Sequence, residues 1–296
     1  MYEYKIARED LYRWCCIPAD ALEKHPDKKV KLVIKDTKDA AMDRAGNMMA
    51  DEVKANNAAG KATTWVLPAG PAEPYTSFIK RINTERISLK NLTVYHMDYV
   101  LDWNSRVYPF GNYFESPHGR MHYRFYEPVD RELRVPEEQR IWPELGDLDR
   151  IDREIEEIGG VDTVWAGVGY KGMVAFCEAP HNPYERVSLA EYAAMKTRIV
   201  NLNDDMIIAM SVRNFGGLYD KIPHQGVTIG MKSMLSAKRC VLMLQGSAWK
   251  QTVLRVILFS EATTEYPVTL FADHVPDCTL ISDRDTAEHP LSRALI

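Results

Sequence analysis

The chain has 296 residues, of which 46% are apolar and 27% are charged, and its formal net charge at pH 7 is −5. This length is enough to bury a full core as one large domain or two small ones. The mild acidity argues against nucleic acid or an anionic membrane as the main partner, but it is compatible with a small anionic substrate because local positive groups can dominate a site.

The cysteines and the N-terminus indicate a cytoplasmic protein. The number of cysteines, five, is odd and no C-x-x-C pair occurs, which favours reduced thiols. Cys15 and Cys16 are adjacent, a spacing that rarely forms a disulfide without strain. Residues 1–5 lack the basic-then-apolar order of a signal peptide, and no run of about 18 apolar residues predicts a membrane span.

Short apolar runs alternate with helical patterns, which is typical of an α/β protein with a mostly parallel sheet. A helix N-cap signal stands at Asp36 and Thr37, and Gly60 is the expected end of the helix that follows. The buried stripe of this helix is predicted to contain Ala41, Ala45, Met48, Met49 and Val53. Strands are expected at residues 30–34, 63–67, 92–97, 161–166, 226–230, 240–244, 268–271 and 279–282.

Residues 147–158 carry the clearest helical pattern before the strand at 161–166. Four apolar residues fall on one face of this helix, and two glycines end it. These apolar residues are Leu148, Ile151, Ile155 and Ile158. No internal repeat and no low-complexity linker interrupts the chain, so we predict a single domain over residues 1–296.

The segment 99–142 differs from the rest because it is rich in aromatic residues, His, Arg and Pro, and its periodicity is weak. A long irregular insert in a compact domain is often a lid or a binding loop. A surface excursion that is packed by its own aromatic side chains is the other interpretation.

Three loops follow expected strands and are candidates for a ligand site. They are residues 67–74, the loop that begins at Asp98, and residues 167–178. In open parallel sheets, ligands bind beyond the carboxyl ends of the strands. Since parallel strands end at the same edge, we expect these loops to converge on one pocket.

The order of several motifs carries a family resemblance. Residues 167–178 read G-V-G-Y-K-G-M-V-A-F-C-E and resemble the motif G-x-G-x-D-G-H-x-A-F-N-E of glucosamine-6-phosphate deaminases and the related 6-phosphogluconolactonases. The resemblance extends over about residues 30–285. It implies a mostly parallel, Rossmann-like α/β sheet with helices on both faces, as in the NagB, RpiA and CoA-transferase proteins.

The resemblance implies roles for two of the earlier loops. Residues 67–70, L-P-A-G, are similar to the family's L-P-T-G-G-T-P loop, whose backbone amides hold the sugar phosphate, so Ala69 and Gly70 would bind the phosphate. Pro71 has no N–H and removes one donor. Residues 95–99 look like the family's F-N-M-D-E-Y, so Asp98 would be the base that moves a proton between C1 and C2 of the open-chain sugar. Without the resemblance, a common turn at 67–70 and a turn-capping role for Asp98 are the alternatives.

At residues 167–178 the chain departs from the family. There, Gly167 begins the loop, Lys171 replaces the acid, Met173 replaces the histidine, and Glu178 is retained. A thioether binds no proton, so Met173 cannot open the sugar ring. Glu178 could form an ion pair with Lys171, or Lys171 could stabilise an enediolate. Another residue would have to open the ring, and the nearest histidines in sequence are His96, His118 and His122.

Two cationic residues far downstream match the family's phosphate ligands. Residues 211–215 place Arg213 in the position of a phosphate-binding arginine. Residues 246–250, G-S-A-W-K, resemble the family's G-S-x-K with one extra residue, so Lys250 would also reach the phosphate. Arginine supplies a bidentate fork and lysine a point charge. Solvated surface positions for both side chains are the alternative.

The sequence therefore predicts a sugar-phosphate isomerase or deaminase that acts through Asp98 and lacks the family's histidine. A non-catalytic sugar-phosphate sensor is the second hypothesis; residues 1–29 are too short for a DNA-binding helix-turn-helix, so a sensor would need a separate partner. A sugar lactonase is a third and weaker one, because lactonases also use the missing histidine. No redox cofactor, no metal, no nucleic acid and no membrane partner is expected, and the resemblance is compatible with a homo-oligomer.

Overall fold

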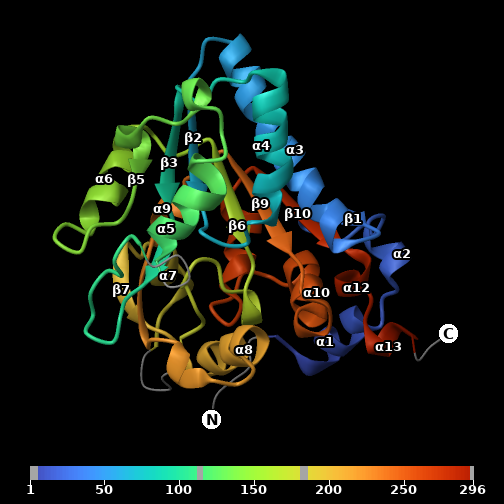
Figure 1. Ribbon diagram of the computed structural model, residues 1–296. Coiled ribbons are helices and arrows are strands. Elements are labelled where there is room, and N and C mark those ends of the chain that lie inside the picture. The colour runs from blue at the N-terminus through green and yellow to red at the C-terminus, as the bar shows by residue number, and fades with distance from the viewer. Residues whose placement is uncertain (1–5, 112–115, 181–185, 294–296) are drawn as a thin grey trace.

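A seven-stranded parallel sheet forms the centre of the protein in the computed structural model, which describes residues 6–111, 116–180 and 186–293. Its strand order is β1-β10-β9-β6-β2-β3-β5, and Figure 1 shows helices packed around it. The strands are β1 (Lys31–Lys35), β2 (Thr63–Leu67), β3 (Leu92–His96), β5 (Arg140–Ile141), β6 (Thr163–Gly167), β9 (Arg239–Leu244) and β10 (Asp277–Asp283). The predicted fold class is confirmed.

The α-helices fall into longer elements that cover the sheet and short ones in the connections. The longer ones are α1 (Arg8–Cys15), α3 (Lys38–Ala58), α4 (Glu73–Glu85), α6 (Asp149–Glu157), α8 (Asp204–Phe215) and α10 (Gln251–Phe259). The short ones are α2 (Ala19–Leu22), α5 (Pro117–Met121), α7 (Leu189–Ala193), α9 (Met231–Leu235), α11 (Leu270–His274), α12 (Arg284–Ala287) and α13 (Pro290–Arg293). No helix of the described residues is both long and apolar enough to cross a membrane.

Apolar clusters cover both faces of the central sheet. Successive residues of the middle strands alternate between them: Trp165 belongs to the cluster under α3 and α4, whereas Val164 and Ala166 belong to the cluster on the opposite face. This alternation follows from the period of two along a strand. Helices α3 and α4 also contact each other directly, because Arg81 binds Asp51 and the carbonyl of Asn47. Strands buried on both faces explain the near-continuous apolar runs of the sequence.

A second, antiparallel sheet lies at the carboxyl edge of the first. It has the order β4-β8-β7, with β4 (Asp98–Val100), β7 (Arg198–Asn201) and β8 (Gln225–Thr228). Only Met97 separates β3 from β4, and its backbone is bonded on both sides: its N–H donates to Leu67 at 3.0 Å and its carbonyl accepts from Ile229 at 2.7 Å. The chain thus passes from one sheet to the other within one residue.

Local signals explain where the elements begin and end. The Thr37 hydroxyl accepts a hydrogen bond from the Ala40 amide at 3.1 Å, which caps α3 as predicted. Most of the predicted buried stripe of α3 is buried, with Met48 half-buried at its edge. In α6, Ile151 and Ile155 are buried, but Ile158 is 48% exposed because it follows the last helical residue.

One predicted strand is wrong. Residues 268–271 begin in a 3₁₀ turn, η7 (Pro267–Thr269), and continue into α11. Pro267 stands at the first position of the turn, where a proline has no N–H to lose, and Phe271 is fully buried. A four-residue apolar run has no period of its own, and a buried helical turn fits it as well as a strand.

The segment 99–142 combines two kinds of structure, although residues 112–115 lie outside the described part, as do residues 1–5. Its first part contains the last two residues of β4 and an exposed turn, where Trp103 is 54% exposed. Its second part packs on α4 through fully buried side chains such as Phe125. The turns of this part are η1 (His122–Tyr126), a π-helical turn, η2 (Arg131–Leu133) and η3 (Glu137–Gln139).

Candidate functional site

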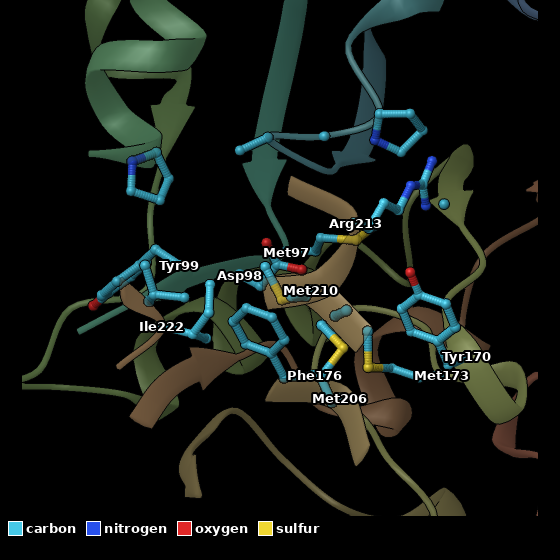
Figure 2. Close-up of a pocket in the computed structure, with 18 of the residues that line it drawn as sticks. Met97, Asp98, Tyr99, Tyr170, Met173, Phe176, Met206, Met210, Arg213 and Ile222 are labelled. Carbon is cyan, nitrogen blue, oxygen red and sulfur yellow. The ribbon is translucent and has the colours of Figure 1, made fainter. Parts of the chain in front are cut away.

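A cavity of about 410 Å³ lies where the two sheets meet, at the carboxyl ends of the parallel strands. Residues that follow β2, β3, β6 and β9 line it, together with residues of α8. Its volume lies within the range of small-molecule sites. The cavity contains six of the eight predicted site residues, namely Ala69, Gly70, Asp98, Gly167, Arg213 and Lys250. Figure 2 shows Asp98 and Arg213 among the side chains around it.

Asp98 is held at the junction of the two sheets. It is the first residue of β4 and pairs through its backbone with Thr228 of β8. Its carboxylate faces the cavity, but the surrounding protein removes most water from it. This burial raises the pKa of Asp98 to about 7, and the charge of Arg120 opposes the shift. Near neutral pH the group can therefore both accept and return a proton.

Lys250 is buried directly before α10 and also lines the cavity. Its side chain is only 7% exposed, and its ammonium donates a hydrogen bond to the Val168 carbonyl at 2.5 Å. Burial lowers the pKa of Lys250 to about 7, and the nearby charge of Arg213 acts in the same direction. Among the described residues no carboxylate forms an ion pair with this ammonium. An incoming anion would therefore supply its missing partner.

Arg213 comes from the last turn of α8, which is fixed at its other end. The amide of Asn203, the residue before the helix, donates to Glu178 Oε2 at 2.9 Å. The Arg213 side chain is exposed and reaches the same cavity as Lys250. Arg213 and Lys250 lie near enough to interact electrostatically, and together they form what we call the cationic wall of the cavity. Two cations so placed form a site for a doubly charged anion.

The loop after β2 brings backbone amides to this wall. Among the described residues, the N–H groups of Ala69 and Gly70 have no hydrogen-bond partner. The loop lies against Gly167, where a Cβ atom would come within 2.4 Å of Pro71 Cδ. A glycine at 167 is therefore required for the loop to lie as close as it does. The amides and the two cations together can bind a phosphate group.

Lys171 and Glu178 do not reach the cavity, which corrects the expectation that they face the substrate. They line a small neighbouring recess. The Lys171 ammonium pairs with Asp205 at 3.0 Å, not with Glu178, and its side chain is 58% exposed. Burial raises the pKa of Glu178 to about 7 despite the hydrogen bond from the Asn203 amide. Glu178 thus holds the start of α8, and Lys171 cannot stabilise an enediolate in this arrangement.

Met173 forms part of an apolar wall of the cavity beside Asp98. Residues of the loop after β6, of α8 and of the turn before β8 make up this wall. They are Met173, Phe176, Met206, Met210 and Ile222, of which Met210 packs at the edge of the cluster. In Figure 2 these side chains surround the part of the cavity below Asp98. The position that holds a histidine in the family is therefore occupied by a group that cannot carry a proton.

The three histidines considered as replacements do not line the cavity. His96 is fully buried, bonds to the Tyr126 hydroxyl at 2.8 Å and stacks on one face of Trp142 at 3.6 Å. His118 stacks on Trp142 at 3.8 Å, and burial lowers its pKa to about 4. His122 is partly exposed and lies near Glu127. His96 and His118 act in packing, and none of the three is placed to open a sugar ring.

The cavity also contains polar residues that sequence reasoning did not identify. Glu73 forms an ion pair with Lys38 at 2.7 Å. Gln245 follows β9 and is 5% exposed, and its Oε1 has no partner among the described residues. Tyr170 also lines the cavity. Because Tyr170 lies inside the motif at 167–178 and Gln245 comes directly after a predicted strand, their positions in the sequence could have identified both as candidate site residues. Arg120 lies in the segment without periodicity and gave no signal.

No metal site is apparent in the part of the chain that the structure describes, since no group of three His, Cys, Asp or Glu side chains there could hold an ion.

A comparison with family models finds no match. Curated proteins are similar over half or more of the chain in some cases and over slightly less than half in others. A glucosamine-6-phosphate deaminase of Caenorhabditis elegans is 26% identical over 262 residues, which cover 86% of this chain and 90% of the relative. A glucosamine-6-phosphate deaminase of Thermoanaerobacter pseudethanolicus is 30% identical over 138 residues, which cover 47% of this chain and 49% of the relative.

Solved structures share the fold. A monomeric glucosamine-6-phosphate deaminase, described as the missing link of the NagB superfamily, superimposes with a TM-score of 0.71 at 23% identity and covers 87% of this chain and 99% of its own. A 6-phosphogluconolactonase from Trypanosoma cruzi has a TM-score of 0.61 at 16% identity and covers 89% of this chain and 97% of its own. At these identities the likeness establishes the architecture.

Proposed function

Because this chain belongs to the glucosamine-6-phosphate deaminase family, which is related to the 6-phosphogluconolactonases, we propose that it is an enzyme that moves a proton between C1 and C2 of an open-chain sugar phosphate. Asp98 would be the base. Arg213, Lys250 and the amides of Ala69 and Gly70 would hold the phosphate.

A single observation carries this proposal: the carboxylate of Asp98 and the cations Arg213 and Lys250 line one cavity. These residues are 152 positions apart at the extremes (250 − 98), and only the fold brings them together. Burial raises the pKa of Asp98 to about 7. A base of this pKa takes a proton from carbon at neutral pH and can return it as an acid.

The proton transfer follows from this placement. With the phosphate held at the cationic wall, the Asp98 carboxylate would remove the proton from C2 of the open-chain aldehyde, and the electron pair would shift to O1 to give an enediolate. Return of this proton to C1, with the hydroxyl proton of O2 passing to O1, gives a hydroxyl at C1 and a carbonyl at C2. If C2 carries an amino group, the same shift gives a C2 imine, and water then releases ammonia and leaves the ketose.

The replacement of histidine by Met173 limits this chemistry. Since the thioether carries no proton and His96, His118 and His122 lie elsewhere, we propose that the substrate binds already open or opens spontaneously. Turnover of cyclic sugars would then be slow, whereas the exchange of the C2 proton would remain detectable.

The test is exchange of the C2 proton of glucosamine 6-phosphate, and of a C1 proton of fructose 6-phosphate, in heavy water, followed by NMR, with ammonia measured in parallel. The wild type should exchange the proton, and Asp98→Asn should reduce the rate by about 10²–10⁴-fold. Asp43→Asn, which changes an exposed carboxylate on α3, serves as the matched control.

Two outcomes would contradict the proposal. Thermal stabilisation by these sugar phosphates without any exchange would favour a non-catalytic sensor. If no phosphorylated sugar stabilises the protein, the assignment of the cationic wall to phosphate is wrong.

A further inference from the structure

We infer that Tyr170 is an additional ligand of the phosphate group, donating a hydrogen bond from its hydroxyl beside Lys250 and Arg213. The inference rests on the proposed function, since it assumes that an anion binds at the cationic wall. Nothing in the motif resemblance assigns a role to this residue.

The tyrosine ring is fixed in place at this wall. Tyr170 begins the turn η4 (Tyr170–Gly172) directly after the first residues of the motif. Its ring lies edge-on to Trp249, with centroids 5.4 Å apart, and its centroid is 5.9 Å from Lys250 Nζ. In Figure 2 the hydroxyl end of the ring points toward the side of the cavity where Arg213 lies, away from Met173. The hydroxyl therefore belongs to the cationic part of the cavity.

The hydroxyl of Tyr170 is buried, yet it has no hydrogen-bond partner among the described residues. An unpaired buried hydroxyl is unfavourable, and a native protein usually satisfies it. Tyr99, another tyrosine that lines the cavity, provides a contrast, because its hydroxyl already donates to the Pro143 carbonyl at 2.8 Å. Tyr170 thus has a free donor at a ligand cavity, which a bound anion would satisfy.

The donors of the loop after β2 explain why another ligand is needed. Pro71 has no N–H, so the loop provides one amide fewer than the family's pattern. The Lys250 ammonium uses one of its three N–H donors on the Val168 carbonyl. A phosphate monoester has three terminal oxygens that accept several hydrogen bonds. The phenol O–H of Tyr170 would add a neutral donor without further charge repulsion between Lys250 and Arg213.

The test is Tyr170→Phe, which removes one oxygen atom and keeps the ring. Binding of inorganic phosphate and of glucosamine 6-phosphate is measured by calorimetry, and the variant should bind both roughly 10-fold more weakly. The KM for the sugar phosphate should rise while kcat changes little, because the lost bond holds the phosphate in the ground and transition states alike. Tyr219→Phe, at a tyrosine that is 62% exposed, is the matched control.

A second measurement observes the wild-type protein and uses the variant only to assign one signal. In wild-type protein labelled with ¹³Cζ-tyrosine, the Tyr170 signal, assigned by its loss in Tyr170→Phe, should shift on addition of phosphate. The melting temperature of Tyr170→Phe without ligand should be equal to or above that of the wild type, since an unpaired hydroxyl is removed.

The inference and the proposed function can fail separately. An unchanged phosphate affinity in Tyr170→Phe, or a ¹³Cζ signal that phosphate leaves in place, overturns the inference even if the wild type exchanges the C2 proton. Absence of that exchange in a wild type whose phosphate affinity depends on Tyr170 refutes the enzymatic proposal and supports the phosphate ligand.

Discussion

Two ionisable side chains face the cavity with pKa values near 7, and both owe this mainly to burial. Burial disfavours the charged form, so it raises the pKa of Asp98 and lowers that of Lys250. The proposed reaction needs both groups charged: Asp98 as a carboxylate to accept the proton and Lys250 as an ammonium to bind the anion. Each is only partly in that form at neutral pH, and a bound anion would favour the charged lysine.

This arrangement predicts a narrow pH optimum. The value of kcat/KM should rise as pH increases through about 7, because Asp98 loses its proton, and should fall above about 7, because Lys250 loses its own. The charge of sulfate is constant in this range, so its affinity should depend only on the protonation of Lys250. Sulfate should therefore bind more weakly as pH rises from 7 to 9. In Lys250→Arg, the affinity for sulfate should not change with pH. A flat sulfate affinity in the wild type would contradict the role of Lys250.

At the scale of elements, the segment 99–142 shows why helical or strand periodicity could not be found there. Its second part changes from an α-helical to a π-helical turn and then to two 3₁₀ turns, so its buried side chains follow no single period. Phe125 stacks on Phe78 of α4, with ring centroids 5.5 Å apart, and lies edge-on to Tyr75, with ring centroids 4.8 Å apart. This part belongs to the core, whereas the exposed turn around Trp103 does not.

Substitutions in the two parts should therefore have different effects. Phe125→Ala should lower the free energy of unfolding by about 3–5 kcal/mol, because it leaves a cavity between α4 and the turn η1. Trp103→Ala should change it by less than about 0.5 kcal/mol. Urea unfolding of both variants measures the difference. A small effect of Phe125→Ala would mean that the second part is a detachable lid.

Particular residues show what could be predicted from the sequence. The strands were located because their apolar runs are bounded by turn residues, and 63–67 matches β2 in both ends. The cavity residues after β2, β3 and β6 followed from the rule that parallel strands end at one edge, whereas Lys250 after β9 followed from the family resemblance. Lys171 was misplaced because its left-handed backbone, with φ of 49°, directs it away from the cavity toward Asp205, and no sequence pattern specifies that turn.

At the scale of the whole molecule, the cationic site reduces stability. Lys250 is held in the core with a single carbonyl as hydrogen-bond partner, and a charged group so placed is disfavoured in the folded state. The lowered pKa of Lys250 determines how stability depends on pH. Between about pH 10 and pH 7 the lysine gains its proton in the unfolded chain but not in the folded protein. The free energy of unfolding therefore falls as pH decreases from about 10 to 7.

Lys250→Met should therefore stabilise the protein at pH 7 while it weakens the binding of anions. We expect the free energy of unfolding to increase by about 1–3 kcal/mol, since methionine fills a similar volume without charge. Thermal melts with and without phosphate provide the measurement, and phosphate should raise the melting temperature of the wild type more than that of the variant. Lys232→Met, at a surface ion pair with Glu156, is the control. A less stable Lys250→Met would show that the ammonium supports the fold.

Two side chains of the cavity, those of Asp98 and Arg213, differ in how firmly the fold holds them. Asp98 lies one residue from the central sheet, between backbone bonds of both sheets, so its carboxylate has little freedom. Arg213 extends from the far end of a helix that is anchored at its start and is followed by Gly216 and Gly217. A shorter or longer carbon skeleton could therefore be accommodated by displacement of the guanidinium alone. We expect pentose and hexose monophosphates to bind with similar strength, with selectivity residing in the configuration of the two carbons nearest the carboxylate.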